Sequence, residues 1–398
     1  MLVAGAVLTT SVLALAGCST NPLSTDKAKP AAATSSHTTQ AGQQDFSGHV
    51  DVNVRRAAMH VKINRVMRVQ ADRAQLQRVS LTSDHGPVPG KLAGNGSSWR
   101  ATGLLRTDTA YILRARAVDN HGVRKDFTRT FRTRKLTLDE QTYPSFSPTD
   151  GSTVGIAMPV IVRFDVPVTK RASIQRHLQV QTQPAQKGSW HWISDNEVHW
   201  RPKHYWKPGT DVTVRADIRS VPAAKGVYGQ LNRKETFHIG RSQITRVNLD
   251  TDQLTVHRGG HVIRTIPVSA GQEPEFTTRS GIKVIVDKEL STRMNSETIG
   301  INPNSAQGYD LSDVRYAMRL TYSGEFLHAA PWSVASQGHA NTSHGCTGMS
   351  TANAHWLFDS SLIGDPVVFT GTNKPMTLTN GFGDWNESFR QYKEGSAL

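Results

Sequence analysis

Apolar and polar residues alternate in short runs through the first half of the chain. Residues 50–54 are Val-Asp-Val-Asn-Val, and residues 111–118 show the same period of two. Because successive side chains point to opposite faces of a strand, each run predicts a strand with one buried face. Turn-forming stretches such as residues 119–122 separate the runs. The pattern predicts a mainly β fold that begins with two Ig-like β-sandwich domains, at residues 46–137 and 138–240.

A third domain is expected at residues 241–372, and it is mostly β with few helices. Residues 257–260, His-Arg-Gly-Gly, separate two alternating runs and predict a hairpin. Further strands are expected at residues 281–286 and 318–322, and one helix should begin after Ser350 as its N-cap. The remaining segment, residues 373–398, is expected to dock back on this domain.

Four tryptophans are concentrated in the second sandwich, at Trp190, Trp192, Trp200 and Trp206. Such a cluster can stack on sugars, but within a sandwich it is more often part of the core. We therefore predict that these side chains are core residues and leave them out of the candidate site.

The amino terminus has the features of an export signal. Residues 3–16 form an apolar run that is short for a membrane span, and it ends in Leu15-Ala16-Gly17-Cys18. This ending resembles the lipobox of bacterial lipoproteins, which implies that residues 1–18 are a leader and that Cys18 is lipidated. A plain secretory leader with an incidental Cys18 is the alternative, and no Lys or Arg precedes the apolar run. Residues 19–45, rich in Ser, Thr, Ala and Gln, are expected to be a flexible linker.

The formal net charge of +14 indicates an anionic partner or surrounding, such as nucleic acid, an acidic membrane face or a wall polymer. Aromatic residues do not interleave with the Lys and Arg residues, so we do not expect nucleic acid to be the partner. We assign the excess charge to the solvated faces of the Ig-like domains rather than to a discrete site. The two cysteines lie in very different surroundings, and a disulfide between them is not expected.

One loop carries the candidate chemistry, with His328, His339 and the sequence Ser343-His344-Gly345-Cys346. Three interpretations remain open from the residues alone. Cys346 can be a buried filler, although its neighbours are not apolar. It can be a metal ligand with the histidines, although the spacing of His344 and Cys346 is unusual for zinc. It can also be a nucleophile that a histidine activates, with backbone N–H groups near Gly345 holding an oxyanion.

The combination of His328 with Ser343-His344-Gly345-Cys346 resembles the signature of the L,D-transpeptidase catalytic domain. The surrounding residues 323–324, 330–334 and 338–342 resemble the mycobacterial and other actinobacterial members. The resemblance extends to residues 190–192 and 200–202 in the second sandwich and to residues 383–386 in the tail. It therefore covers nearly the whole folded region and implies that the third domain is an L,D-transpeptidase catalytic domain.

This resemblance implies a reaction on peptidoglycan stem peptides that needs no cofactor and no metal. Cys346 would attack the carbonyl of the third residue of a tetrapeptide stem and expel the terminal D-Ala. The thioester would then acylate the side-chain amine of a third residue on a neighbouring stem, giving a 3→3 cross-link. The resemblance further implies covalent inhibition by carbapenems and a lipid-anchored enzyme on the extracytoplasmic face of the cell membrane, within the cell wall.

The resemblance also assigns roles to individual residues. His328 would be the base, oriented by the carbonyl of Ala329, and His344 and Gly345 flank the nucleophile. The substrate-binding residues implied by the family are Tyr309, Ser323, Gly324, Met294, Trp332, Ser343 and Gly348. Most family members have Asn at the position of Gly348, so we hypothesise an altered acyl-enzyme lifetime or acceptor choice here.

Two other functions remain as alternatives. Water in place of the amine acceptor would make the protein an L,D-carboxypeptidase, which uses the same catalytic residues. A non-catalytic lipoprotein that binds the wall through its sandwiches belongs to a different class, and the intact Ser343-His344-Gly345-Cys346 sequence argues against it.

Overall fold

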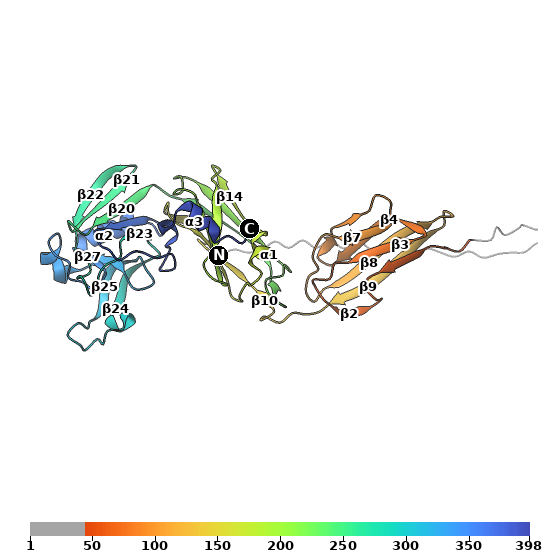
Figure 1. Ribbon diagram of the computed structural model, residues 1–398, viewed down its shortest axis with the longest axis horizontal. Coiled ribbons are helices and arrows are strands. Elements are labelled where there is room, and N and C mark those ends of the chain that lie inside the picture. Colours follow the sequence, from red (N-terminus) through yellow and green to blue (C-terminus); the bar gives the residue numbers. More distant parts are fainter. Residues whose placement is uncertain (1–43) are drawn as a thin grey trace, which may run out of the picture. The chain divides into compact units, whose positions relative to one another are not determined.

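The computed structural model describes residues 44–398 (Figure 1). The expected leader, Cys18 and the linker up to residue 43 lie outside the described residues. Residues from Phe46 to Leu398 form one compact unit. In this part of the chain, no helix is long and apolar enough to cross a membrane.

The first sandwich contains one sheet in the order β1-β3-β7-β6 and another in the order β2-β9-β8-β4-β5 (Figure 1). The buried positions of β8 are every second residue, including Tyr111, Leu113 and Ala115, as the alternating sequence predicts. These side chains pack with Trp99 and Phe131 in the core between the sheets. The strands are β1 (His49–Val52), β2 (Ala58–Val61), β3 (Arg68–Asp72), β4 (Ala74–Ser83), β5 (Gly86–Val88), β6 (Gly90–Leu92), β7 (Ser98–Ala101), β8 (Ala110–Asp119) and β9 (Arg124–Thr133).

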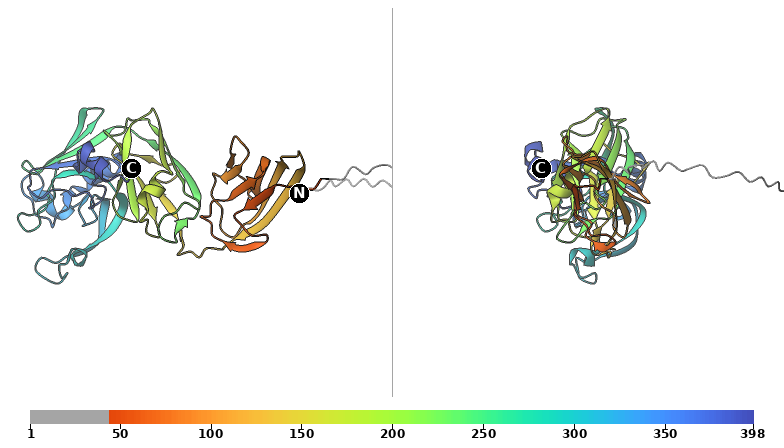
Figure 2. Two further views of the ribbon diagram at one scale, coloured as in Figure 1. Left: turned by 45° about the vertical axis from the view of Figure 1, so that its right-hand side comes forward. Right: turned by 90° about the vertical axis from the view of Figure 1, so that its right-hand side faces the viewer.

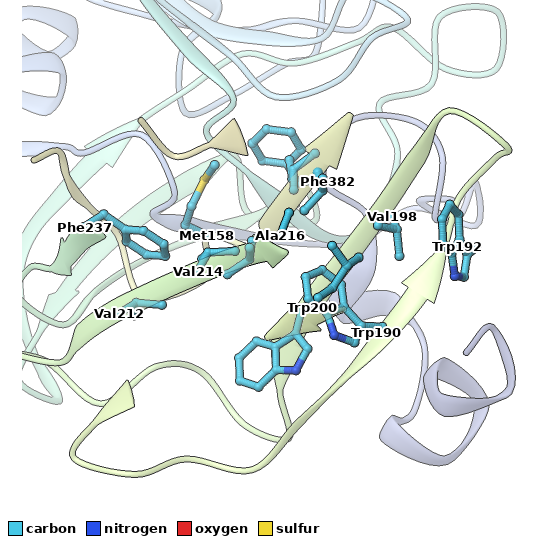
Figure 3. Packing of buried hydrophobic residues seen from close by; sticks show 14 of the residues in the cluster. Met158, Trp190, Trp192, Val198, Trp200, Val212, Val214, Ala216, Phe237 and Phe382 are labelled. Atoms are coloured by element: carbon cyan, nitrogen blue, oxygen red, sulfur yellow. The ribbon is translucent and has the colours of Figure 1, made fainter. Parts of the chain in front are cut away.

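The second sandwich pairs a sheet of order β11-β13-β16-β15 with one of order β12-β19-β17-β14, and a small β10-β18 sheet adjoins them. Its elements are β10 (Gln141–Thr142), β11 (Pro144–Ser147), β12 (Thr153–Val154), β13 (Val160–Phe164), α1 (Arg171–Gln175), β14 (Leu178–Gln183), β15 (Gly188–Trp192), β16 (Glu197–Pro202), β17 (Asp211–Asp217), β18 (Tyr228–Gly229) and β19 (Asn232–Ile239). Trp190, Trp192, Trp200 and Trp206 are all buried in its core, so their prediction as core residues is confirmed. Figure 3 shows the first three of them among the other core side chains.

The third domain has a sheet of order β22-β21-β20-β28-β23 and a second sheet of order β24-β25-β26-β27. The strands are β20 (Gln243–Asn248), β21 (Gln253–Arg258), β22 (His261–Pro267), β23 (Gly281–Val284), β24 (Asp287–Asn295), β25 (Asp310–Arg319), β26 (Phe326–Ala329), β27 (Thr347–Met349) and β28 (Pro366–Thr370). The helical elements are η1 (Ser296–Ile299), η2 (Pro331–Ser336) and α2 (Thr351–Ser360). The mainly β fold class is confirmed.

Two local predictions in this domain are also confirmed. The hairpin joins β21 and β22 through Gly259 and Gly260, whose φ angles of 56° and 90° lie in the left-handed region that glycine adopts without strain. Helix α2 begins directly after Ser350, whose hydroxyl accepts a hydrogen bond of 3.3 Å from the backbone N–H of Asn353.

The C-terminal segment contacts two domains, whereas we expected it to dock on the third domain. Its first part lies on that domain, where the Met376 N–H donates to the Ser280 carbonyl at 2.7 Å. Its last part, with η3 (Asp384–Asn386) and α3 (Phe389–Glu394), packs on the second sandwich (Figure 2). There the Trp385 indole donates to the Ala157 carbonyl at 2.7 Å, and the Trp192 N–H donates to the Gly395 carbonyl at 2.9 Å.

Candidate active site

Parallel pairing of β26 and β27 brings the candidate base and nucleophile together. His328 on β26 is the register partner of Gly348 on β27, and Cys346 immediately precedes β27. The two chain segments are separated by the loop that contains η2 and residues 337–346. A ladder of backbone hydrogen bonds therefore holds the two segments that carry these side chains next to each other.

A cavity of about 310 Å³ lies at this point. It is lined by eight of the predicted site residues, namely Met294, Tyr309, His328, Trp332, Ser343, His344, Cys346 and Gly348. Most of the surface of its walls is apolar, and several Ser, Thr and His side chains contribute polar groups, which is typical of binding sites for small molecules and peptides.

The loop before the nucleophile is held by Ser343. Its hydroxyl donates to the Cys346 carbonyl at 2.6 Å and accepts from the Gly345 N–H at 3.1 Å. Gly345 has a φ angle of 124°, a conformation that side-chain-bearing residues rarely adopt, and its carbonyl accepts from the Thr278 hydroxyl at 2.9 Å. Ser343 and Gly345 thus shape the turn from which the Cys346 thiol projects.

The imidazole of His328 has a defined tautomer. Nδ1 lies 2.8 Å from the Ala329 carbonyl, which can only accept, so Nδ1 carries the proton and Nε2 is left as the basic nitrogen. Burial lowers the pKa of His328, because the charged imidazolium would lose its solvation. His328 is therefore a neutral base at neutral pH, and its ring faces that of Trp332 at a centroid distance of 6.0 Å.

Cys346 is half-buried and its thiol donates to the Gly324 carbonyl at 3.3 Å. Burial raises the pKa of Cys346 to about 11, despite an opposing hydrogen bond from the Phe326 backbone. The resting state is consequently a neutral thiol beside a neutral imidazole. Such a pair can react by transferring the thiol proton to the imidazole as the sulfur attacks.

Tyr309 and His344 form an aromatic wall on one side of the cavity. Their ring centroids lie 5.0 Å apart, and His344 also contacts the ring of Phe276 at 4.3 Å. Burial, with a further contribution from Cys346, raises the pKa of Tyr309 to about 12. Tyr309 therefore keeps its proton and can donate a hydrogen bond into the cavity.

The other predicted residues lie around the cavity rather than in its lining. Ala329 and Gly324 contribute the carbonyl groups that hold His328 and Cys346. Ser323 points away, since its hydroxyl accepts from Arg279 at 3.1 Å and from the Asn380 amide at 2.9 Å. The side chain of Ser323 thus links the turn before β26 to the C-terminal segment.

Gly348 lies where a side chain has little room. A Cβ added to it would lie 2.6 Å from the Cβ of Ala330, which is closer than real contacts allow. Its backbone is fixed as well, because it exchanges hydrogen bonds of 2.8 and 3.0 Å with Ser269.

Five lining residues were not predicted from the sequence. They are Ser269, Leu311, Ala330, Ser333 and Thr342. Ala330, Ser333 and Thr342 lie in the segments that carry the family resemblance. Ser269, just after β22, and Leu311, on β25, lie in segments with no chemical signature. Only the folding of β22, β25 and the loop after β26 around one cavity makes them neighbours.

A buried ion pair beneath the nucleophile was also missed. Lys283 on β23 has a fully buried side chain, and its Nζ lies 2.5 Å from Glu325 Oε2. Glu325 Oε1 accepts from Arg279 at 2.9 Å, and the Glu325 side chain lies beneath Gly345. A lysine inside the apolar run of residues 281–286 is the signal that could have indicated this pair.

A metal centre was one of the open interpretations of this loop. Across residues 44–398, no group of three or more His, Cys, Asp or Glu side chains is arranged to hold a metal ion. The chemistry considered below uses the thiol, the imidazole and the surrounding backbone.

Comparison with known proteins agrees with the fold. The chain matches the family described as Bacterial Ig domain over residues 58–222, a range that spans parts of both sandwiches. It matches the family described as L,D-transpeptidase catalytic domain over residues 242–369.

Relatives match over most of the chain. L,D-transpeptidase 2 from Mycobacterium tuberculosis is 35% identical over 347 residues, covering 85% of this chain and 83% of that protein. L,D-transpeptidase 5 from the same species is 34% identical over 330 residues, with coverages of 81% and 71%. A solved structure of an L,D-transpeptidase in complex with imipenem has 39% sequence identity and a TM-score of 0.50, covering 58% of this chain and 99% of that chain. The chain belongs to the L,D-transpeptidase family.

Proposed function

We propose that this chain forms 3→3 cross-links in peptidoglycan through a thioester on Cys346. The observation that carries the proposal is the neutral pair of Cys346 and His328 in one cavity, with His328 Nδ1 bound to the Ala329 carbonyl and Nε2 left as the base. Family membership supplies the acyl-transfer chemistry to which this pair is suited.

In the first half-reaction the donor is a tetrapeptide stem. His328 Nε2 accepts the thiol proton while Cys346 Sγ attacks the carbonyl carbon of the third residue. The negative charge that forms on the carbonyl oxygen needs hydrogen-bond donors. The Gly345 N–H already donates to Ser343, so the Cys346 N–H and the Tyr309 hydroxyl are the proposed donors. Collapse of the intermediate expels D-Ala as an amine, which takes the proton from His328.

In the second half-reaction an amine on the third residue of a neighbouring stem attacks the thioester. His328 removes a proton from the amine, a new amide bond forms, and the sulfur leaves and is reprotonated as the Cys346 thiol. Water in place of the amine would give a trimmed tripeptide instead. Trp332, 58% exposed at the rim, is positioned to contact the incoming acceptor.

The test is incubation of the full chain with a disaccharide-tetrapeptide, followed by mass spectrometry of the products. We expect a cross-linked dimer that lacks one D-Ala, and no product from Cys346→Ala. His339→Ala is the matched control, because His339 belongs to the same loop but does not line the cavity. A tripeptide alone would move the function to a carboxypeptidase, and no product with an unmodified Cys346 would contradict enzymatic function.

We further propose that carbapenems acylate Cys346. The β-lactam carbonyl is opened by the same thiol attack, with the ring nitrogen as the leaving group. A related enzyme has been solved with imipenem, which supports this proposal. Intact-mass spectrometry after incubation with imipenem should show one adduct on the wild-type chain and none on Cys346→Ala.

We also propose that the protein is anchored by lipid on the extracytoplasmic face of the membrane. The proposal rests on the sequence Leu15-Ala16-Gly17-Cys18 after an apolar run. Metabolic labelling with a radioactive fatty acid should mark the wild-type chain and leave Cys18→Ser unlabelled. Equal labelling of both would contradict lipidation at Cys18.

A further inference from the structure

Most of the net charge of this chain belongs to the first sandwich. Residues 46–137 contain 18 Lys and Arg against 6 Asp and Glu, a formal charge of +12. Residues 138–240 contain 13 against 9, and residues 241–398 contain 13 against 15, giving +4 and −2. We had expected the excess to be spread over both Ig-like domains, but three quarters of their combined charge of +16 belongs to the first. The first sandwich therefore needs an explanation of its own.

Five of these cations line one cavity at the side of the first sandwich. The cavity measures about 980 Å³ and is formed by β1, β2, the adjoining loops and one residue of β9. Its cationic residues, which define the basic cleft, are Arg55, Arg56, Lys62, Arg65 and Arg129. Asp51 is the acidic residue in the lining.

The cations of the basic cleft have no carboxylate partners. Within the described part of the chain, none of the five has an Asp or Glu oxygen within 4.0 Å. Apart from Asp51 in the lining, the acidic residues of the first sandwich are engaged elsewhere: Asp72 with Arg73, Asp84 with His85, Asp108 with Arg132, Asp126 with Arg116, and Asp119 with Ser47. The positive charge of the cleft is consequently uncompensated.

Uncompensated like charges around a hollow repel one another and destabilise the folded domain. The same arrangement concentrates the electrostatic field in the hollow and attracts anions to it. Four of the five residues are arginines, whose planar guanidinium groups bind phosphate through two parallel hydrogen bonds. The composition of the cleft therefore suits phosphate oxygens.

The backbone that forms one wall of the cleft is irregular. Ala57 and His60 have φ angles of 55° and 58°, in the left-handed region that residues with side chains rarely adopt. The pairing of β2 with β9 shifts register between Ala58 and Val61. Such strained conformations are found mainly at functional sites. His60 lines the basic cleft, and Ala57 lies between the lining residues Arg56 and Ala58.

We propose that the basic cleft binds an anionic wall polymer whose repeating units are joined by phosphodiesters. Five cations and one carboxylate leave an excess of four positive charges, whereas one phosphodiester supplies a single negative charge. Several phosphates are needed for neutrality, and a polymer presents them along one chain. A concave site accepts a polymer strand, whereas a membrane surface would be met by a flat or convex face. Binding would hold the enzyme against the wall while the third domain works on stem peptides.

The test measures binding of the full chain, purified in detergent, to fluorescently labelled poly(glycerol phosphate) by anisotropy at several salt concentrations. The cleft variant is Arg55→Gln/Arg56→Gln/Arg129→Gln. The matched control, Arg78→Gln/Arg114→Gln/Arg124→Gln, removes the same charge from exposed positions on β4, β8 and β9. Calorimetry verifies that both variants fold, and Lys62→Gln/Arg65→Gln replaces the first variant if it does not.

We expect the cleft variant to bind at least about tenfold more weakly and the slope of log affinity against log salt to fall by roughly two. The control should lose no more than about twofold, through the general field. Equal weakening of binding by both variants, or a larger loss in the control, would overturn the proposal that the cleft is the binding site. So would failure of the wild-type chain to bind, or binding only to phosphatidylglycerol vesicles. None of these outcomes depends on the activity of Cys346.

Discussion

The cavity around Cys346 and the interface between the second sandwich and the C-terminal segment both bury polar side chains, but they treat charge in opposite ways. In the cavity, burial leaves Cys346 and His328 neutral. In the interface, His199 lies between Asp384 Oδ1 at 2.9 Å and Glu197 Oε1 at 2.7 Å, with almost no exposure. Burial alone would lower the pKa of His199, but these two carboxylates raise it to about 9.

The difference reflects what each region has to do. A charged network satisfies its buried groups in one arrangement only, so it fixes how the C-terminal segment docks. The adjacent Arg201 adds to this, since its guanidinium lies over the Tyr392 ring at 4.3 Å and donates to the Glu387 carbonyl at 2.9 Å. A neutral thiol and imidazole form no ion pair that substrate must break, and charge develops only as the reaction proceeds.

The strongest test of the neutral cavity is His328→Gln. With a thiol pKa of about 11, little thiolate is present at pH 7, so attack depends on the imidazole. We expect the acylation rate with imipenem to fall by about 10³-fold or more at pH 7. The variant should then recover by about tenfold per pH unit as hydroxide replaces the base. Stopped-flow absorbance at the β-lactam band measures both effects, and a loss smaller than tenfold would mean that Cys346 is activated in another way.

The ion pair of Lys283 and Glu325 lies beneath the neutral cavity and is itself a buried charged network. Burial lowers the pKa of Lys283 to about 8, although Glu325 opposes this. Lys283→Met leaves the Glu325 carboxylate buried with only Arg279 as partner, so we expect a loss of about 3–5 kcal/mol in stability. Lys283→Met/Glu325→Leu removes both charges and should recover most of it. With Glu325→Leu as the other single variant, calorimetry of the four proteins completes the cycle, and a double variant no more stable than Lys283→Met would show that the pair is not coupled.

The interface should lose stability as the pH rises from about 6.5 to 9. The folded pKa of His199, about 9, lies above its ordinary value of 6.5, so its stabilising contribution is complete below about pH 6.5 and is lost as the pH rises to 9. The full contribution is roughly 3 kcal/mol. His199→Gln keeps one hydrogen-bond donor but no charge, as a neutral imidazole does. The difference in Tm between wild type and variant should therefore be large at pH 6 and small at pH 9.5, and a constant difference would contradict a charged His199.

Sequence reasoning identified what depends on neighbours along the chain. The alternation of β8, the glycines of the hairpin and the Ser350 cap are local signals, and each was found. The cavity was found because Ser343-His344-Gly345-Cys346 and His328 carry a family signature. Charge by domain is equally plain in the sequence, and counting it separately would have indicated the first sandwich.

What could not be predicted depends on pairs that only folding brings together. His199 and Asp384 are 185 positions apart, and no local pattern links one to the other. Lys283 lies on β23, and Glu325 directly precedes β26, a strand of the other sheet of the third domain. Their contact therefore follows from the packing of β23 behind β26. Docking of the tail on the second sandwich has the same origin, because it requires a surface built by β15 and β16.

The smallest expected effect concerns Gly348, which lines the neutral cavity. At this position the size of the side chain is restricted, whereas its charge is not at issue. Gly348→Ala places a Cβ 2.6 Å from that of Ala330, while two hydrogen bonds to Ser269 keep the strand from moving. Ala330 must then shift, and it leads into the η2 turn that carries Trp332. We expect a loss of about 1–2 kcal/mol in stability and a few-fold rise in KM for the acceptor stem. Gly348→Ala/Ala330→Gly should restore both, because it removes the opposing methyl group.

Gly348→Asn must likewise be combined with Ala330→Gly before it can test a role of position 348 in acyl-enzyme lifetime. If Gly348→Ala is neutral in calorimetry and kinetics, the strands have more freedom than their hydrogen bonds indicate, and the altered position must act through substrate contacts alone.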